Sequence, residues 1–433
     1  MNKDTKYADL RPLWKKALFG SYLILPLKYD DTPNKAYINQ TFKPFVLRTQ
    51  DIGENVKDLI NRQGSGNIGQ AYRISGSVLE KELLGSTYER LSVRKDQHEG
   101  VFSFLDSYLY VFHTKVAFLC VGIRYRDLTT LYNICNPGYT KFRSVFLGHR
   151  ADGIARHFSL ERALGTFAEK CGLSNFFDDN SPAIVEAYVY TLALLPGRFP
   201  NIEVMRQATF NLHLMEDLNH PAEDESEHDL RYVYAVKDQE LGSYSWGCCV
   251  SSQTISYVNG DPSMNLKQAM TVQARDGLPI VMIALYEKFT CLRFTELLRK
   301  SGERDKQKLE ALKKMMLEFK AYGTVDPSNL SRWHNVKQIY GSLLSVNETA
   351  NAIQDIDNKL KILAEQQQDA EQQKSDTVFG IISVFGVVSI VDSMLAIVQS
   401  LSGGQTLDYV TVGGTLASLA VVIAITLRKL KGK

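Results

Sequence analysis

The sequence lacks most of the signals that mark an enzyme or a secreted protein. It contains no GxSxG, P-loop, HExxH or protein-kinase motif, which argues against an enzyme. Its six cysteines form no CxxC pair and have no histidines at ligand spacing, so we expect reduced thiols and neither a zinc site nor a disulfide framework. No apolar signal-peptide segment follows the N-terminus, so we expect the large N-terminal part to stay in the cytosol.

A strong net charge is also missing. The 50 lysines and arginines nearly balance 48 aspartates and glutamates, which argues against nucleic acid as a direct partner. What the chain does have is length and apolar content, since 44% of its 433 residues are hydrophobic and a sizeable core is expected. The long apolar runs, however, gather near the C-terminus.

Two C-terminal segments are long and apolar enough to cross a bilayer. The first, 377–401, contains one carboxylate, and the second, 409–427, contains no charge. The connector 402–408 has no lysine or arginine, whereas the tail 428–433 is basic, so the positive-inside rule places both termini in the cytosol. We therefore predict a multi-pass protein of the inner or plasma membrane; the alternative is a pair of buried helices in a soluble core.

The first apolar segment carries a stripe of small and polar residues. At 100° per residue the stripe falls within an arc of roughly 80°, and Asp392 lies on its flank. We predict that this stripe lines a pore, and the alternative is that it permits close helix packing. The predicted pore-lining residues are Gly386, Ser389, Asp392, Ser393, Ala396 and Ser400.

The region before the hairpin predicts a helical stalk over 283–376. Helices are expected at 283–300 and 303–322, and the chain turns at Asp326-Pro327. From about Ser331 a heptad pattern predicts one unbroken helix that enters the first apolar segment and favours self-association; a Gln-rich linker is the alternative. The seam of this pattern consists of Ile339, Leu343, Val346, Ala350, Ile353, Leu360 and Ala364.

This order of antiparallel helices, a long helix, a hairpin and a basic tail resembles the CorA family of metal-ion transporters. The family's Gly-Met-Asn motif is absent, because the external loop reads Gly403, Gly404 and Gln405 after Ser402. The chain is in this respect similar to a divergent branch, the CorA-like effectors of type III CRISPR systems. That resemblance implies a homo-oligomer, a pentamer in the family, which serves antiviral defence as a ligand-gated ion channel.

In that branch the opening ligand is a nucleotide second messenger, such as the conjugate of S-adenosylmethionine and AMP. The alternative implied by the wider family is a divalent-cation transporter gated by cytosolic Mg²⁺. We assign no metal ligands. Four carboxylates of the stalk are candidates for binding Mg²⁺, and the simpler interpretation is that they are ordinary surface charges. They are Asp355, Asp357, Asp369 and Glu371.

Residues 1–282 are expected to form a cytosolic α/β sensor domain with a mixed sheet. Alternating apolar runs predict the strands, including a hairpin over 106–126 that turns at 113–115, and amphipathic patterns predict the helices between them. The other expected strands are 21–27, 43–48, 187–195 and 231–236, and the expected helices are 51–62, 159–172 and 201–218.

A nucleotide needs cations for its phosphates and flat faces for its base. Arginines next to aromatic residues supply both within one stretch, although surface packing is the alternative. The candidate ligand-binding residues are Arg124, Tyr125, Arg126, Phe142, Arg143 and Arg150. Two further motifs predict loops. GxGxxG at 64–69 follows a helical pattern instead of a strand, and a phosphate-contacting loop is the alternative. The acidic segment 216–229 has no EF-hand-like spacing, and a divalent-cation site is the alternative.

Overall fold

The structure, a computed structural model, describes most of the chain up to residue 370. The described residues are 15–61, 67–135, 145–150, 153–177, 187–215, 230–235, 237, 239, 242–260, 265–301 and 306–370. Contacts divide the chain into two units, Met1–Ile356 and Asp357–Lys433. Of the second unit, the described part is the C-terminal end of one helix.

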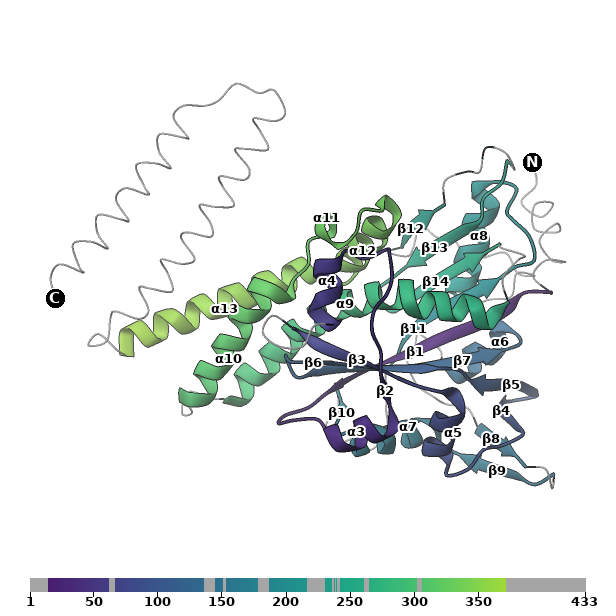
Figure 1. The fold of residues 1–433 in the computed structure, drawn as a ribbon, viewed down its shortest axis with the longest axis horizontal. Coiled ribbons are helices and arrows are strands. Elements are labelled where there is room, and N and C mark those ends of the chain that lie inside the picture. Colours follow the sequence, from purple (N-terminus) through teal and green to yellow (C-terminus); the bar gives the residue numbers. More distant parts are fainter. Residues whose placement is uncertain are drawn as a thin grey trace. The chain divides into compact units, whose positions relative to one another are not determined.

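The described strands of the first unit form one 14-stranded sheet (Figure 1). Its main path runs β12-β13-β14-β11-β1-β7-β5-β4-β8-β9, while β2, β3 and β6 branch from β7, and β10 pairs with β1. The strands are β1 (Leu18–Lys28), β2 (Lys43–Pro44), β3 (Gly69–Ile74), β4 (Arg90–Lys95), β5 (His98–Phe104), β6 (Ser107–Phe112), β7 (Val116–Tyr125), β8 (Val145–His149), β9 (Ala155–Phe158), β10 (Ser174–Asn175), β11 (Tyr188–Leu194), β12 (Arg231–Tyr234), β13 (Trp246–Val250) and β14 (Thr254–Asn259).

The helices become the main element after the last strand, so the described chain is β-rich at first and helical toward its C-terminal part. The helices are α3 (Lys35–Thr41), α4 (Glu54–Asn61), α5 (Gly76–Leu84), α6 (Leu128–Ile134), α7 (Leu160–Lys170), α8 (Ile202–His213), α9 (Leu266–Ser301), α10 (Lys306–Glu318), the π-helical segment Phe319–Gly323, α11 (Pro327–Leu330), α12 (His334–Val346) and α13 (Thr349–Ala370).

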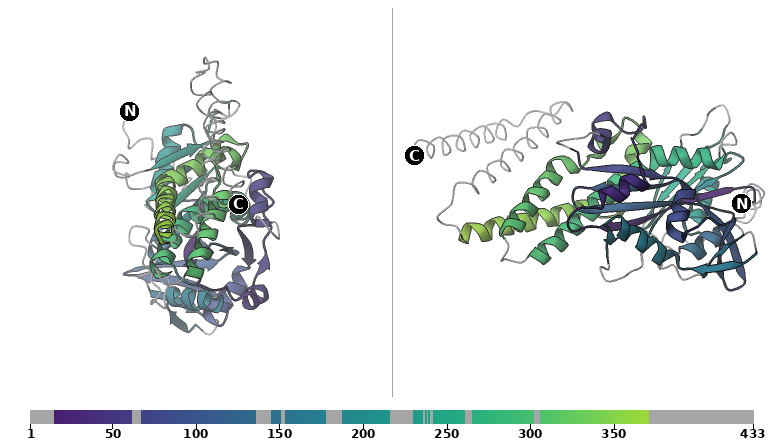
Figure 2. Two further views of the ribbon diagram at one scale, coloured as in Figure 1. Left: turned by 90° about the vertical axis from the view of Figure 1, so that its left-hand side faces the viewer. Right: turned by 60° about the horizontal axis from the view of Figure 1, so that its bottom comes forward.

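The central strands are buried on both faces. One face of β1, β7 and β11 contributes Leu23, Val121 and Val189 to the main hydrophobic core, which also includes residues of α3, α5, α7 and α8. On the other face lies α9, which contacts β1, β7 and β11 (Figures 1 and 2). Because helices cover both faces, β1 reads as a nearly continuous apolar run and not as an alternating one.

Several predicted elements coincide with observed ones. The strands expected at 21–27, 187–195 and 231–236 correspond to β1, β11 and β12, and the predicted hairpin consists of β6 and β7. Its turn includes Lys115 in the left-handed region, with φ 67°. The sheet is mixed, since β11 and β14 run parallel while the other described pairs are antiparallel.

The strand expected at 43–48 is shorter than predicted. Only Lys43 and Pro44 pair with β3, because proline has no N–H for the ladder, although the Phe45 N–H still donates to the carbonyl of Ala71 at 2.8 Å. The helices expected at 51–62, 159–172 and 201–218 contain α4, α7 and α8.

The prediction of one unbroken helix from about Ser331 was wrong. Helix α12 ends at Val346, Glu348 has a left-handed φ of 51°, and α13 begins at Thr349. The heptad pattern was misleading because Ile339, Leu343 and Val346 are buried within this chain, so these positions record packing of α12 on its own unit.

Helix α9 begins 17 residues before the expected helix at 283, so the expected domain boundary at 282 falls inside it. Gly277 and Pro279 obscure this start, because both residues are usually helix breakers. The glycine has a packing reason here: a Cβ at Gly277 would overlap the hydroxyl of Tyr190 on β11. The close approach of helix and sheet therefore explains the residue that hides the helix in the sequence.

Among the described residues, none of the helices has the length and apolar character needed to cross a membrane. The predicted hairpin 377–401 and 409–427, its external loop and the basic tail all lie outside the described residues. The six cysteines are all described, and they are buried free thiols.

Candidate phosphate-binding face and its connection to the helical region

A basic surface extends over one face of strands β4, β5, β7 and β8. Residues directly opposite each other in a sheet share a face. Arg124 of β7 lies opposite Ser103 of β5, Glu99 of β5 lies opposite Arg94 of β4, and Arg90 lies opposite His149 of β8. We call the surface formed by Arg90, Arg94, Glu99, Ser103, Arg124 and His149 the basic face.

The charged residues of the basic face are open to solvent, although Ser92 and Leu147 on the same side of β4 and β8 are buried. Leu91, Val93, Phe102 and Phe146 alternate with the residues of the basic face and belong to the hydrophobic core. In contrast, Arg94, Ser103 and Arg124 are exposed, and the Arg90 side chain is 47% exposed. Three arginines against one glutamate make this surface suited to an anion.

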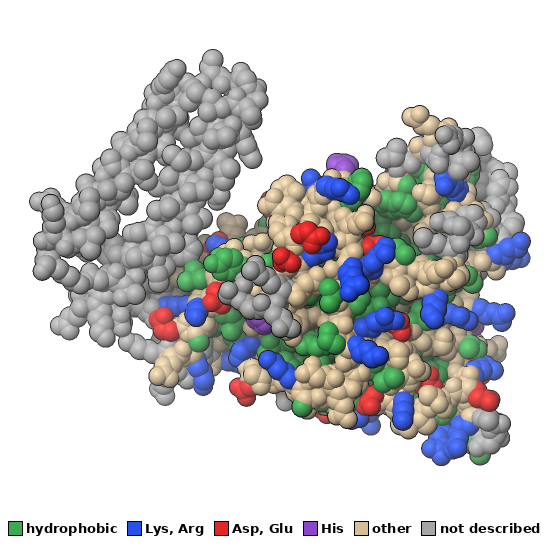
Figure 3. Space-filling model, in the orientation of Figure 1, with side chains coloured by type: hydrophobic (Ala, Val, Ile, Leu, Met, Phe, Trp, Pro, Cys, Tyr) green, Lys and Arg blue, Asp and Glu red, His purple; other side chains and the backbone are tan. Residues whose placement is uncertain are grey.

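Helix α9 lies on the same side of the sheet as the basic face. Gly20 of β1 is paired with Arg124, and a Cβ on Gly20 would point at the Met270 sulfur of α9, 2.7 Å away. Figure 3 shows more lysine and arginine than aspartate and glutamate side chains on the side of the molecule that carries α9. The basic face therefore begins where the cover of α9 ends.

His149 lies between a hydroxyl and a carboxylate. Its Nε2 is 2.8 Å from the Ser92 Oγ and 3.4 Å from the Glu99 Oε1, and Arg90 donates to the same Glu99 oxygen at 2.8 Å. A hydrogen bond from Ser92, followed by the charges of Arg90, His149 and Arg94, lowers the pKa of Glu99. Because serine and glutamate approach the same ring nitrogen, the group lacks the geometry of a catalytic triad, which uses both nitrogens.

The residues predicted for a ligand are only partly brought together. Arg124 is on the basic face, Arg126 follows β7 and is exposed, and Arg150 follows His149 in the turn between β8 and β9. Tyr125 instead points into the core, where its ring stacks on Phe19 and its hydroxyl lies 2.8 Å from the Ser21 Oγ. Phe142 and Arg143 lie outside the described residues.

Arg90 and Arg94 were not predicted as ligand-binding residues, because neither is next to an aromatic residue in the sequence. The signal that would have found them is the alternation in β4, where Arg90, Ser92 and Arg94 occupy every second position between Leu91 and Val93.

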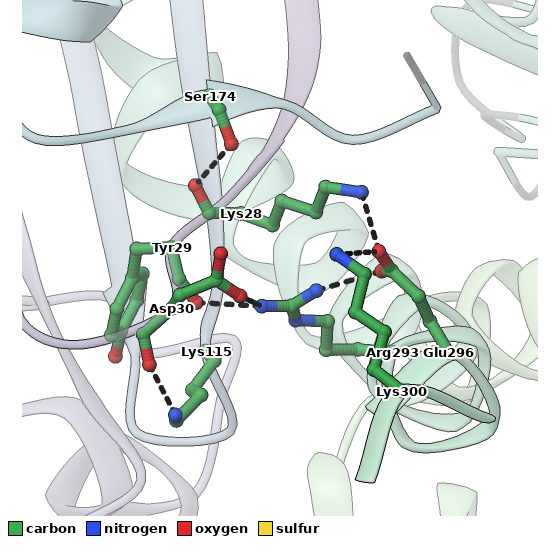
Figure 4. A network of polar contacts seen from close by, with 8 residues as sticks. All are labelled: Lys28, Tyr29, Asp30, Lys115, Ser174, Arg293, Glu296 and Lys300. Carbon is green, nitrogen blue, oxygen red and sulfur yellow. Dashed lines mark hydrogen bonds and ion pairs between the residues drawn. The ribbon is translucent and has the colours of Figure 1, made fainter. Parts of the chain in front are cut away.

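A buried charge network joins the end of β1 to α9 (Figure 4). Arg293 is fully buried; it donates to the Tyr29 carbonyl at 2.8 Å, to Asp30 at 2.6 Å and to Glu296 at 2.7 Å. Glu296 also accepts from Lys28 at 2.8 Å and from Lys300 at 2.9 Å. This network fixes the C-terminal half of α9 on the sheet.

The same network sets the ionisation of Glu296. Burial opposes its charge, but hydrogen bonds from Lys28, Lys300 and Arg293 outweigh burial and lower its pKa to about 2. The Arg293 Nε is buried and has no hydrogen-bond partner among the described residues, so the other two guanidinium nitrogens make all its bonds.

A second connection joins α9 to α12. The Glu287 side chain is buried, and its Oε1 accepts from the Tyr340 hydroxyl at 2.5 Å and from the Val325 N–H at 2.9 Å. The neighbouring Lys288 donates to the Asn347 carbonyl at 2.6 Å, in the short segment that separates α12 from α13. Burial raises the pKa of Glu287 to about 7, although both hydrogen bonds favour its charged form.

The structure gives less support to the other predicted sites. Gly69, the last glycine of GxGxxG, begins β3, and a Cβ there would lie 2.5 Å from the Val111 carbonyl oxygen, so strand packing explains this glycine. Within the described part of the chain, no group of three or more His, Cys, Asp or Glu residues could hold a metal ion. The pore-lining candidates, the external loop and the acidic segment 216–229 lie outside the described residues.

Comparison with known proteins gives no match: no family model, no curated protein and no solved structure matches this chain.

Proposed function

We propose that the chain is a homo-oligomeric ion channel of the inner or plasma membrane, opened by a nucleotide second messenger that binds its N-terminal part. The observation that carries this proposal is the pair of apolar segments, 377–401 and 409–427, joined by a short connector and followed by a basic tail. The resemblance to CorA-like effectors supplies the antiviral role, the pentamer and the S-adenosylmethionine–AMP conjugate as ligand.

The basic face supports a phosphate-bearing ligand. Arg90 and Arg94 of β4 and Arg124 of β7 place guanidinium groups on two strands that are separated only by β5, and a guanidinium matches the geometry of a phosphate. Helix α9 contacts this sheet and binds α12 through Glu287, which gives a path from the ligand toward the C-terminal helices. A ligand opens a pore only if it binds the open state more tightly than the closed state.

Ion flux from vesicles that contain the purified full chain tests the proposal. We expect flux on addition of the S-adenosylmethionine–AMP conjugate or a cyclic oligoadenylate, and none without ligand. Equilibrium binding is measured in parallel with the same compounds and ATP. Absence of both binding and flux for all of them would overturn the proposal.

The basic face makes a prediction of its own. Replacing Arg90 and Arg124 together by glutamine should weaken binding of the opening nucleotide roughly tenfold or more, because each charge-assisted hydrogen bond contributes about 1.5–3 kcal/mol before screening by solvent. The salt dependence of binding should also become shallower. The matched control is Arg162→Gln, an exposed arginine on α7, on the core side of the sheet. Equal losses in the control and the double variant would show that the phosphate binds elsewhere.

The first apolar segment makes another prediction. If the stripe around Ser393 lines the pore, Asp392→Asn should reduce cation preference and Ser393→Leu should reduce conductance, because symmetry repeats each side chain around the axis. Single-channel recording measures both quantities. Unchanged conductance and selectivity in both variants would reject this lining and favour helix packing as the role of the stripe.

A CorA-type Mg²⁺ transporter is the second candidate function. It rests on the same pair of apolar C-terminal segments and on the resemblance to the CorA family. Mg²⁺ uptake without a nucleotide, inhibited by Mg²⁺ on the cytosolic side, would favour this candidate over the first.

A further inference from the structure

A groove of about 280 Å³ lies between α4 and the segment that connects α10 to α11. We call it the α4–α11 groove. It is formed by parts of the chain that are far apart in sequence, and its lining residues are Asn55, Val56, Leu59, Tyr322, Thr324, Val325, Asp326 and Asn329.

The lining combines an apolar wall with hydrogen-bonding groups at its edges. Val56 and Val325 are buried, while Asn55, Asp326 and Asn329 are exposed and offer amide and carboxylate groups. No lysine or arginine is among the described lining residues, so the groove is unsuited to a phosphate. Its size, just below that of usual drug-sized pockets, fits one ring system better than a whole dinucleotide.

Tyr322 supplies a flat face to this groove. It belongs to the π-helical segment Phe319–Gly323, a geometry that is rare and is often found at functional sites. In this segment Phe319 packs inward on Tyr286 and Phe294, whereas Tyr322 is 60% exposed. An exposed tyrosine ring beside amide groups can bind a nucleobase, by stacking on its face and hydrogen bonding to its edge.

The groove is also connected to α12. Val325 lines it, and the N–H of the same residue donates to the Glu287 carboxylate at 2.9 Å, which in turn accepts from Tyr340 of α12. A ligand that orders the segment around Val325 therefore acts on Glu287 through the Val325 N–H, and on α12 through the hydrogen bond that Tyr340 donates to Glu287.

We propose that the α4–α11 groove binds an uncharged, planar nitrogen heterocycle of the nucleobase class, and that its occupancy stabilises α12 through Val325 and Glu287. The amides of Asn55 and Asn329 recognise the N–H and ring-nitrogen groups at the edge of the heterocycle, and Tyr322 stacks on its face. Asp326 Oδ1 already accepts from Ser328 at the start of α11, so Asp326 offers only its other oxygen, to an N–H group. This site is separate from the basic face, and the binding step does not depend on the channel function.

Ligand-observed NMR on the purified full chain in detergent tests the binding step, with adenosine, guanosine, cytidine and ribose as probes. At least one nucleoside should bind and ribose should not. Tyr322→Ala and Asn55→Ala should each weaken that binding at least tenfold, whereas Tyr132→Ala, which changes an exposed tyrosine on α6, should not. Failure of every nucleoside to bind at millimolar concentration, or unchanged affinity in both groove variants, would overturn the proposal.

Amide hydrogen exchange tests the link to α12. The bound nucleoside should slow exchange in His334–Val346, and Tyr340→Phe should abolish this slowing while binding persists, because only the hydroxyl that meets Glu287 is removed. Unchanged exchange in the wild type would refute the link. Replacing Arg90 and Arg124 should leave nucleoside binding intact. If the wild-type chain binds no nucleoside but still responds to the phosphate ligand, the groove proposal is refuted and the channel proposal stands.

Discussion

Arg293→Met should lower the free energy of unfolding of the N-terminal unit by roughly 3–5 kcal/mol, because it removes one partner from a buried ion pair. The guanidinium of Arg293 is fully buried and bridges Asp30 and the Tyr29 carbonyl to Glu296. Methionine fills similar space but donates no hydrogen bond, so a buried carbonyl and a largely buried carboxylate each lose a donor. Thermal unfolding of the full chain in detergent, followed by tryptophan fluorescence, measures the loss.

The control for this variant is Arg299→Met, an exposed arginine near the end of the same helix. Its effect should stay within about 0.5 kcal/mol, as is usual for surface substitutions. Equal effects of the two variants would mean that the network around Arg293 does not hold α9 on the sheet.

Acid should weaken the same network. The hydrogen bonds from Lys28, Lys300 and Arg293, acting against burial, bring the pKa of Glu296 from 4.5 to about 2. The stability contributed by its ionised form is therefore complete above about pH 4.5 and is lost as the pH falls toward 2. Glu296→Gln should remove this part of the acid sensitivity.

The strands could be predicted from the sequence where the hydrophobic pattern of neighbouring residues is sufficient. Two apolar runs around a short polar turn predict the hairpin of β6 and β7, and a continuous apolar run predicts β1. Helix α9 was only half recognised, since Gly277 and Pro279 look like a stop. The reason for Gly277 is the hydroxyl of Tyr190, which lies 87 positions earlier in the chain and leaves no space for a Cβ at residue 277.

The candidate sites depended on contacts that no local pattern contains. Lys28 meets Glu296 across 268 positions, and Glu287 meets Tyr340 across 53. The heptad seam in α12 was visible, but the sequence could not tell whether Leu343 packs against a second copy or against its own chain. Tyr125 failed as a ligand candidate for a related reason: its position in β7 turns it to the core face, while its neighbour Arg124 points to the other.

Glu287→Gln should make the protein more stable above neutral pH and less sensitive to pH between about 5 and 8. Burial raises the pKa of Glu287 from 4.5 to about 7, so the folded state holds a proton there that the unfolded state has released. Stability from this group is therefore complete below about pH 4.5 and declines as the pH rises through 7, by on the order of 3 kcal/mol. Glutamine stays neutral and keeps an oxygen that accepts from Tyr340 and Val325.

Other groups near this carboxyl titrate as well, so the difference between variant and wild type is the quantity to follow. Burial lowers the pKa of His113, which makes stability rise with pH in part of the same range and opposes the contribution of Glu287. Tyr286 and Tyr340 ionise only at higher pH, because burial raises the pKa of each. Subtracting the two unfolding curves at each pH cancels the contribution of His113.

The stability difference should be near zero at pH 5 and should favour Glu287→Gln at pH 8, while Glu169→Gln, at an exposed site on α7, should show no trend. A difference that is the same at both pH values would mean that Glu287 is ionised throughout and that its two hydrogen bonds outweigh burial. In that case Tyr340 would be held by a charge at every physiological pH. If the difference follows the expected course, the folded state that buries Glu287 between α9 and α12 loses stability as the pH rises, because the cost of burying the ionised carboxylate outweighs the stronger hydrogen bonds that it accepts from Tyr340 and Val325.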